Sequence, residues 1–171
     1  MIVYFVRHAE RLKTGGRNPK SPISETGFNQ ARSVGERLKK VQIDVIYSSS
    51  YERAKQTAEV ISKIINKPIE LWDHLIEANS EKESFDDLNK RSEAVLVHLL
   101  EHHQNDSVLC VSHASMIEFI IAKMVFGEHL NPQIMQDIKK HFWTTNTGIS
   151  ICEFREEEGW VLRTFNDSSH L

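Results

Sequence analysis

Short apolar runs alternate with amphipathic runs along the whole chain, and this alternation is what most limits the folds open to it. Four runs have the length and composition of strands: residues 1–6, 44–50, 69–72 and 107–113. Each is followed, directly or after a loop, by a stretch in which apolar residues recur at helical spacing. Strands that alternate with helices predict a parallel sheet with helices on both faces.

The first predicted helix follows a loop rich in glycine, proline and basic residues, and Ser24 or Thr26 is its expected N-cap. A short fifth helix is expected from 131 to 142, after a nearly wholly apolar fourth helix at 114–127. The expected inward-facing residues of the first three helices are Phe28, Ala31, Val34, Leu38 and Val41; Ala54, Ala58, Ile61 and Ile65; and Leu88, Val95, Leu96, Leu99 and Leu100.

The chain ends in two strand-like runs, 148–154 and 159–165, which are expected to pair as an antiparallel hairpin. The sequence therefore predicts an α/β fold: a three-layer α-β-α sandwich with a mostly parallel sheet and an antiparallel edge. A chain of 171 residues, 40% of them apolar, predicts a single domain over residues 1–171. The polar loop 74–84 and the segment 131–142 are expected to form a small cap over the sheet.

Net charge and the positions of the cysteines limit the expected binding partners and cellular compartment of the protein. The net charge of −3, with both signs mixed along the chain, gives no reason to expect nucleic acid or an acidic membrane as partner. The first apolar run is too short for a signal peptide or a membrane span. Cys110 and Cys152 lie in strand-like runs, so we expect buried free thiols and a cytoplasmic protein. Nothing in the sequence indicates an oligomeric state.

Arginine and histidine residues stand where three of the predicted strands end. Arg7 and His8 follow the first strand, Arg53 follows the second in "SSSYERAKQTA", and His113 ends the fourth in "VSHAS". The carboxyl ends of parallel strands meet at one edge of a sheet, where open α/β sheets bind their ligands. Taken singly, each residue has an ordinary structural explanation. Their common position predicts one shared site.

A phosphate group explains why so many cationic side chains would gather at one point. Arginine presents planar, bidentate donors to phosphate oxygens and keeps its charge. A histidine beside two guanidinium groups has its cationic form disfavoured, which should lower its pKa and leave a neutral nitrogen free to attack phosphorus. The sequence therefore predicts a phosphate site with a histidine nucleophile.

The order of these motifs resembles the histidine phosphatase, or phosphoglycerate mutase-like, superfamily over almost the whole chain. The residues that carry the resemblance are Arg7-His8-Ala9-Glu10; Gly27, Gln30 and Ala31 in "ISETGFNQA"; Arg53 in "SSSYERAKQTA"; and His113 in "VSHAS". The resemblance implies that His8 forms a phosphohistidine while Arg7, Arg53 and His113 hold the phosphoryl oxygens. It also implies that no metal or other cofactor is needed.

The departing alkoxide needs a general acid, and Glu77 in "LIEANS" is the expected one because its place resembles that of the family's acid. Glu81 and Glu83 are alternatives in the same loop. The expected substrate is a phosphorylated small molecule or a phosphoprotein. The basic residues Arg11, Lys13, Arg17 and Lys20 either favour a substrate with a second anionic group or are simply solvated.

Several departures from the mutase branch favour hydrolysis over phosphoryl transfer between hydroxyls. Ala9 and Ala114 replace glycines, Arg11 stands where that branch has serine or threonine, and Thr14 where it has asparagine. The alternatives are a mutase and a weakly active phospho-ligand binding module. A metallohydrolase is disfavoured because there is no H-E-x-x-H pattern, and a serine hydrolase because "SHAS" lacks the glycine elbow.

Overall fold

A single six-stranded sheet organises residues 1–13 and 18–171, the part of the chain that this computed structural model describes. The strand order is β3-β2-β4-β1-β5-β6. Strands β3, β2, β4 and β1 run parallel, and β5 and β6 add an antiparallel hairpin at one edge. The strands are β1 (Ile2–Arg7), β2 (Val45–Ser48), β3 (Ile69–Leu71), β4 (Ser107–Ser112), β5 (Ile149–Arg155) and β6 (Gly159–Asp167).

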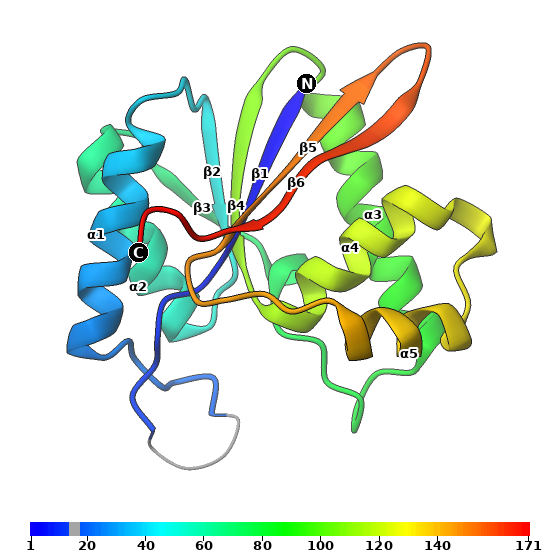
Figure 1. Ribbon diagram of the computed structural model, residues 1–171, viewed down its shortest axis with the longest axis horizontal. Helices are drawn as coiled ribbons and strands as arrows, with labels where there is room; N and C mark the ends of the chain where they lie inside the picture. The colour runs from blue at the N-terminus through cyan, green and yellow to red at the C-terminus, as the bar shows by residue number, and fades with distance from the viewer. Residues whose placement is uncertain (14–17) are drawn as a thin grey trace.

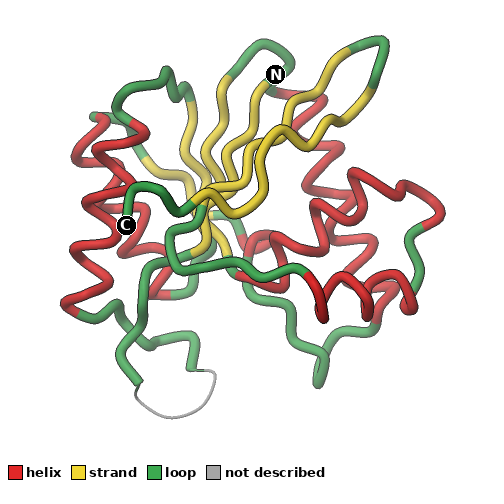
Figure 2. Tube along the Cα trace, in the orientation of Figure 1, coloured by secondary structure: helices red, strands yellow, loops and turns green. Residues whose placement is uncertain are grey.

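Helices cover both faces of this sheet, with α1 and α2 on one side and α3, α4 and α5 on the other (Figures 1 and 2). Alternate residues of β1 enter different cores: Val3 and Phe5 pack with α3 and α4, whereas Tyr4 and Val6 pack with α1 and α2. The helices are α1 (Glu25–Leu38), α2 (Glu52–Ile65), α3 (Phe85–His102), α4 (Ala114–Phe126) and α5 (Pro132–His141), with 3₁₀ turns η1 (Asp73–Leu75) and η2 (Gly127–His129). The predicted three-layer sandwich is confirmed.

The first helix begins where expected but buries a different stripe. Ser24 is the N-cap, and its side chain accepts a hydrogen bond from the amide of Gly27. Phe28 is 45% exposed and Val41, beyond the end of α1, is 42% exposed, so placing them in the core was wrong. The buried line runs through Gly27, Ala31, Val34, Gly35 and Leu38. A helix turns by about 100° per residue, which carries Phe28 off that line.

The third helix shows how local sequence sets a boundary. Ser84 and Asp87 form a capping box that satisfies amides at the start of α3. Leu88, Val95, Leu96 and Leu99 are buried as predicted, whereas Leu100 is only partly buried.

Both cysteines are free and buried, as the sequence predicted. Cys110 lies on β4 and Cys152 on β5, the two strands that flank β1. Burial raises the pKa of the Cys152 thiol to about 12. Among the helices of the described residues, none combines the length and apolar character required to cross a bilayer.

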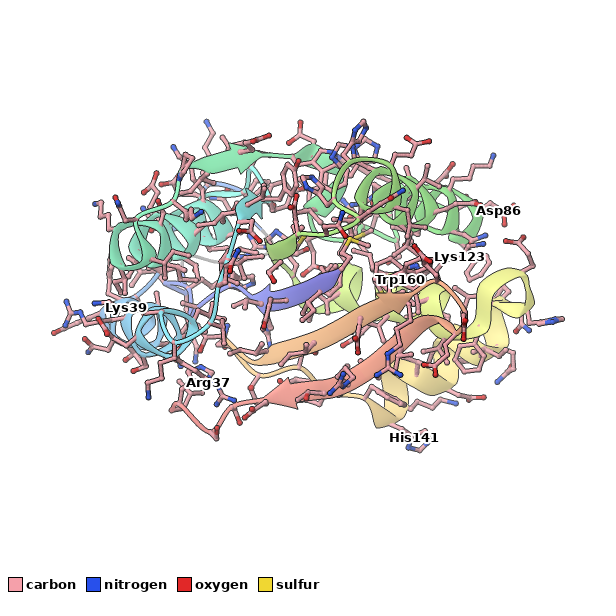
Figure 3. The ribbon with its side chains drawn as sticks, turned by 90° about the horizontal axis from the view of Figure 1, so that it is seen from above. Arg37, Lys39, Asp86, Lys123, His141 and Trp160 are labelled. Atoms are coloured by element: carbon pink, nitrogen blue, oxygen red, sulfur yellow. The ribbon has the colours of Figure 1, made fainter. Side chains whose placement is uncertain are left out.

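The end of the chain is fastened to the outer face of α1. The guanidinium of Arg37 donates to the Asp167 carboxylate and to the Ser169 hydroxyl, and Figure 3 shows Arg37 beside this last segment. One residue from the end, Nε2 of His170 lies 3.2 Å from the hydroxyl of Thr147, in the turn before β5. The C-terminal segment thus supports the edge of the sheet where the parallel strands end.

Candidate active site

A cavity of about 360 Å³ opens at the edge where the parallel strands end, and it contains four of the five predicted site residues. It is lined by Arg7, His8, Glu10, Arg11, Lys13, Arg53, Glu77 and Asn146. The fifth, His113, is fully buried, and its ring centroid lies 5.0 Å from that of His8. Residues from four separate parts of the chain therefore meet at one place, at the sheet edge the strand pattern predicted.

The hydrogen bonds around His8 define which ring nitrogen carries the proton. Nδ1 lies 2.7 Å from the carbonyl oxygen of Ala9, which can only accept, so Nδ1 is the N–H of the ring. Nε2 then has a free electron pair, and it accepts from Nε of Arg53 at 3.0 Å. The backbone of His8 is fixed as well: its amide donates to the carbonyl of Ser112 at 2.8 Å.

Burial, more than neighbouring charge, keeps His8 neutral. The side chain is 4% exposed, and desolvation followed by the charge of Arg53 lowers the pKa of His8 to about 3. The neutral ring was predicted, but from the arginines alone, so the order of the causes is a correction. At neutral pH, Nε2 is a deprotonated nitrogen at the cavity, which is the state a nucleophile requires.

His113 is the N-cap of α4 and forms the deepest part of the site. Its Nε2 lies 2.8 Å from the hydroxyl of Ser49, and its Nδ1 is buried without a hydrogen-bond partner in the described part of the chain. Burial, then the proximity of His8 and Arg53, holds the pKa of His113 well below its usual value. A neutral histidine keeps one proton, so the ring can offer one N–H to a bound oxygen without adding charge.

The guanidinium groups are held from two sides of the cavity. Arg53 stands in the first turn of α2, is 5% exposed, and packs with its guanidinium carbon 5.3 Å from the ring centroid of Tyr51. Arg7, at the end of β1, donates through Nη1 to the carbonyl of Thr144. Its Nε is buried and has no partner within residues 1–13 and 18–171. A buried guanidinium donor without a protein acceptor is available to a bound anion or water.

The turn at residues 144–148 is a part of the site that the sequence analysis missed. The amide of Thr147 donates to the carbonyl of Arg7 at 2.9 Å, and Nδ2 of Asn146 donates to the carbonyl of His8 at 2.9 Å. Asn146 also lines the cavity. Gly148 allows the turn to close, because a Cβ there would lie 2.1 Å from Oδ1 of Asn166. The only signal was its position before a strand that runs antiparallel to the others.

The residues of the "ISETGFNQA" stretch act on the site through Glu10. Oε1 of Gln30 accepts from the amide of Glu10 at 2.8 Å, and the Ser24 hydroxyl donates to the Glu10 carboxylate at 2.7 Å. A Cβ on Gly27 would lie 2.2 Å from the carbonyl oxygen of Glu10, so only glycine fits. This helix start therefore fixes the course of the chain just after His8.

Among the three candidate acids, Glu77 is the one that lines the cavity. Glu81 is exposed on the same loop. Glu83 accepts from Nη2 of Arg91 at 2.8 Å and from the amide of Asn79 at 3.0 Å, so its carboxylate is occupied in holding the loop. The charge of Glu77 acts on both Arg7 and Arg53, raising the pKa of each against the effect of burial.

Arg91 on α3 holds the loop that carries Glu77, through contacts before and after that residue. Its Nη1 donates to the carbonyl of His74 at 3.1 Å and to that of Ile76 at 2.8 Å, while Nη2 binds Glu83. One guanidinium thus ties both ends of the loop to a rigid helix. No feature of the sequence indicated this role.

The predicted basic loop divides into two parts. Arg11 and Lys13 line the cavity, whereas Lys20 is exposed away from it. Arg17 and Thr14 lie outside the described residues.

Comparison with known proteins agrees with the motif order. The family model of the histidine phosphatase superfamily (branch 1) matches residues 3–82 and 77–168. A Bacillus subtilis (strain 168) protein named "Uncharacterized phosphatase PhoE" is 27% identical, over 99% of this chain and 96% of its own length. A Salmonella arizonae protein named "Probable phosphoglycerate mutase GpmB" is 26% identical, over 99% of this chain and 94% of its own.

A solved structure has the same arrangement of elements over nearly the whole chain. The crystal structure of phosphoserine phosphatase from Entamoeba histolytica in complex with 3-phosphoglyceric acid superposes with a TM-score of 0.82 at 23% identity, covering 99% of this chain and 98% of that one.

Proposed function

The chain belongs to the histidine phosphatase superfamily, and we propose that within it this protein is a metal-independent phosphomonoesterase that works through a phosphohistidine on His8. The observation that carries the proposal is the state of His8: a neutral ring whose unprotonated Nε2 lines a cavity between two arginines. A phosphorylated small molecule or a phosphoprotein is the proposed substrate. The PhoE and phosphoserine phosphatase names support hydrolysis.

In the proposed first step, Nε2 of His8 attacks phosphorus in line with the bond to the leaving oxygen. The equatorial oxygens, over which charge is spread in the transition state, would be held by Arg7, Arg53 and His113. The Nε of Arg7 supports this assignment, because it is a buried donor that lacks an acceptor within the described residues.

Arg53 has to move before His8 can react. Its Nε–H points at the electron pair of His8 Nε2 that must form the bond to phosphorus. Phosphate oxygens are charged and accept from a guanidinium more strongly than a neutral imidazole does. We therefore propose that substrate binding draws Arg53 away and frees the nucleophile.

Glu77 is the proposed general acid for the leaving oxygen, and water would then remove the phosphoryl group from His8. Protonating a departing alkoxide typically contributes 10²- to 10⁴-fold. The position of Glu77 on the cavity wall supports this role, since Glu83 is bound to Arg91.

The proposal includes a small cap built from the 74–84 loop and the 131–142 segment. Support comes from an apolar cluster that joins Ala78 of the loop, Phe119 of α4 and Met135 of α5. This contact would hold the Glu77 loop over the cavity while leaving the site open to water.

A mutase is the second candidate, because one relative is named a probable phosphoglycerate mutase. The alignment with that relative runs over 209 positions, so it has segments without counterpart in the 171 residues here. A shorter chain has less to shield a phosphoenzyme from water, which favours hydrolysis. Incubation with 3-phosphoglycerate separates the two: free phosphate is expected, whereas formation of 2-phosphoglycerate would show a mutase.

The test of the central proposal is to quench the enzyme during turnover and locate the phosphoryl group by mass spectrometry. We expect it on His8, in enzyme that turns over p-nitrophenyl phosphate in the presence of EDTA. A label on any other residue, or activity that EDTA removes, would overturn the mechanism. Complete absence of turnover would favour a phospho-ligand binding module.

A further inference from the structure

Two basic side chains at the entrance of the cavity, Arg11 and Lys13, form no ion pair within the described residues. The backbone of Arg11 pairs with Ile23 in an isolated antiparallel bridge, and the amide of Leu12 donates to the carbonyl of Pro22 at 2.9 Å. In an extended segment, residues two apart point to the same side. Arg11 and Lys13 accordingly line the cavity, while Leu12 between them is 44% exposed.

The Arg11 guanidinium has an unmet hydrogen-bond donor. Its Nη1 is buried, and no acceptor lies within reach in the part of the chain that the structure describes. Within those residues neither Arg11 nor Lys13 forms an ion pair. A shielded donor without an acceptor is costly and is usually explained by an ion or water that completes the site.

The unmet donors of the cavity fall into two groups. Arg7, next to His8, has an unmet Nε donor where the phosphoryl group is proposed to bind, and Arg11, three residues after His8, has the unmet Nη1 donor, both counted within the described residues. Phosphate has five heavy atoms, and a cavity of about 360 Å³ has room for more of the substrate than that. The second group of donors is therefore available to another part of the substrate.

Glu10 is the carboxylate nearest in sequence to these cations. It also lines the cavity, but its Oε1 accepts from the Ser24 hydroxyl at 2.7 Å, and its amide is bound by Gln30. The Arg11 charge is felt at the reaction centre, where it contributes to the lowered pKa of both His8 and Arg53. Four cationic side chains line the cavity against the two carboxylates of Glu10 and Glu77, so the cavity still favours an anion.

We propose that Arg11 and Lys13 form a subsite for a second anionic group, a carboxylate or a second phosphate, on the phosphomonoester substrate. The inference rests on the proposed phosphatase function and defines its substrate class. Arg11 binds the second group through its guanidinium, and Lys13 adds a mobile positive charge at the entrance.

The test compares two substrates that share a three-carbon skeleton: 3-phosphoglycerate and glycerol 3-phosphate, in which a hydroxymethyl group replaces the carboxylate. We expect wild-type kcat/KM to be at least about tenfold higher for 3-phosphoglycerate, since charge-assisted hydrogen bonds contribute on this scale. Arg11→Gln should lower kcat/KM for 3-phosphoglycerate about 10- to 100-fold, mainly through KM. For glycerol 3-phosphate the same variant should lower kcat/KM about threefold or less. Lys13→Gln should have the same selectivity with a smaller effect.

The matched control is Lys55→Gln on α2, which removes one positive charge outside the cavity, where Lys55 pairs with Glu59. This variant should leave kcat/KM unchanged for both substrates. A parallel measurement uses His8→Ala, which cannot form the phosphohistidine, and titrates both compounds by calorimetry. Fructose 1,6-bisphosphate against fructose 6-phosphate repeats the comparison for a second phosphate.

Equal losses on both substrates in Arg11→Gln would show that Arg11 acts on the phosphoryl group itself and would overturn the subsite. Equal affinity of His8→Ala for the members of both pairs would overturn it as well. Neither result affects the phosphatase proposal, which fails only if the phosphoryl group is not found on His8. If turnover of both esters is absent, the calorimetric comparison still decides whether the subsite exists.

Discussion

The floor and the rim of the cavity are built in different ways. At the floor, His8, Arg53 and His113 are almost fully buried: His8 directly follows β1, Arg53 stands in the first turn of α2, and His113 is the N-cap of α4. At the rim, Glu77 and Arg11 are partly exposed and stand on loops. Groups that stabilise a transition state must be preorganised. We therefore propose that the floor performs phosphoryl transfer, while the rim selects the leaving group and the substrate.

The largest effect is expected when the proposed nucleophile at the floor is removed. His8→Ala should lower kcat by on the order of 10⁴-fold or more for every phosphomonoester, because it removes the proposed nucleophile. Steady-state assays on alkyl and aryl phosphates check this. His102→Ala, an exposed histidine of α3, is the matched control. Substantial residual turnover on either ester would mean that the floor does not act through His8.

Removing the proposed acid at the rim should affect substrates unequally. Glu77→Gln is expected to lower kcat about 10²- to 10⁴-fold for alkyl phosphates, the usual contribution of general acid catalysis. The loss should be much smaller for p-nitrophenyl phosphate, because nitrophenolate leaves without a proton. Glu81→Gln, on the same loop but exposed, should change neither rate. Equal losses on both esters would show that Glu77 acts in phosphoryl transfer itself and not as an acid for the leaving group.

Weakening the contacts of Arg91 with the Glu77 loop should also affect alkyl phosphates more than p-nitrophenyl phosphate, but by a smaller factor. Arg91→Lys keeps the charge but cannot donate to His74, Ile76 and Glu83 together. We expect kcat for alkyl phosphates to fall about tenfold, a fraction of the full general-acid contribution, with little change for p-nitrophenyl phosphate. Arg32→Lys, exposed on α1, is the control. A uniform loss, or a loss explained by a lower melting temperature, would contradict a positioning role.

The buried floor should also give the protein a characteristic acid sensitivity. The pKa of His8 is about 3 in the folded state and about 6.5 when unfolded, so between these values the unfolded state binds the extra proton. The free energy of unfolding should therefore fall as pH drops from about 6.5 towards 3, by on the order of 1 kcal/mol per pH unit for this histidine.

Urea unfolding at a series of pH values measures that slope. His8→Asn should flatten it, leaving the part due to His113, whose pKa is also lowered by burial. His141→Asn, which removes an exposed histidine at the end of α5, is the matched control. An unchanged slope in His8→Asn would show that His8 is not neutralised by burial.

Much of the floor could be read from the sequence because it follows from one rule about parallel sheets. Arg7 ends a parallel strand, and Arg53 and His113 each follow one, so knowing the strands was enough to bring them together. The turn at 144–148 follows no such strand. It precedes β5, and because β5 is antiparallel to β1, its beginning lies at the same edge as the ends of the others. Strand direction is set by pairing, which a single run of residues does not reveal.

The succession of strands and helices along the chain, the sheet edge that holds the site, and most of the side-chain types gathered there could be predicted from the sequence, because these depend on local periodicity and on what ends each strand. Tertiary structure alone decided that Glu77 rather than Glu83 lines the cavity, that His8 keeps its proton on Nδ1, and that burial is the main cause of its low pKa. Each of these depends on which atoms surround a group in space, and neighbours from distant parts of the chain are fixed only when the fold is complete.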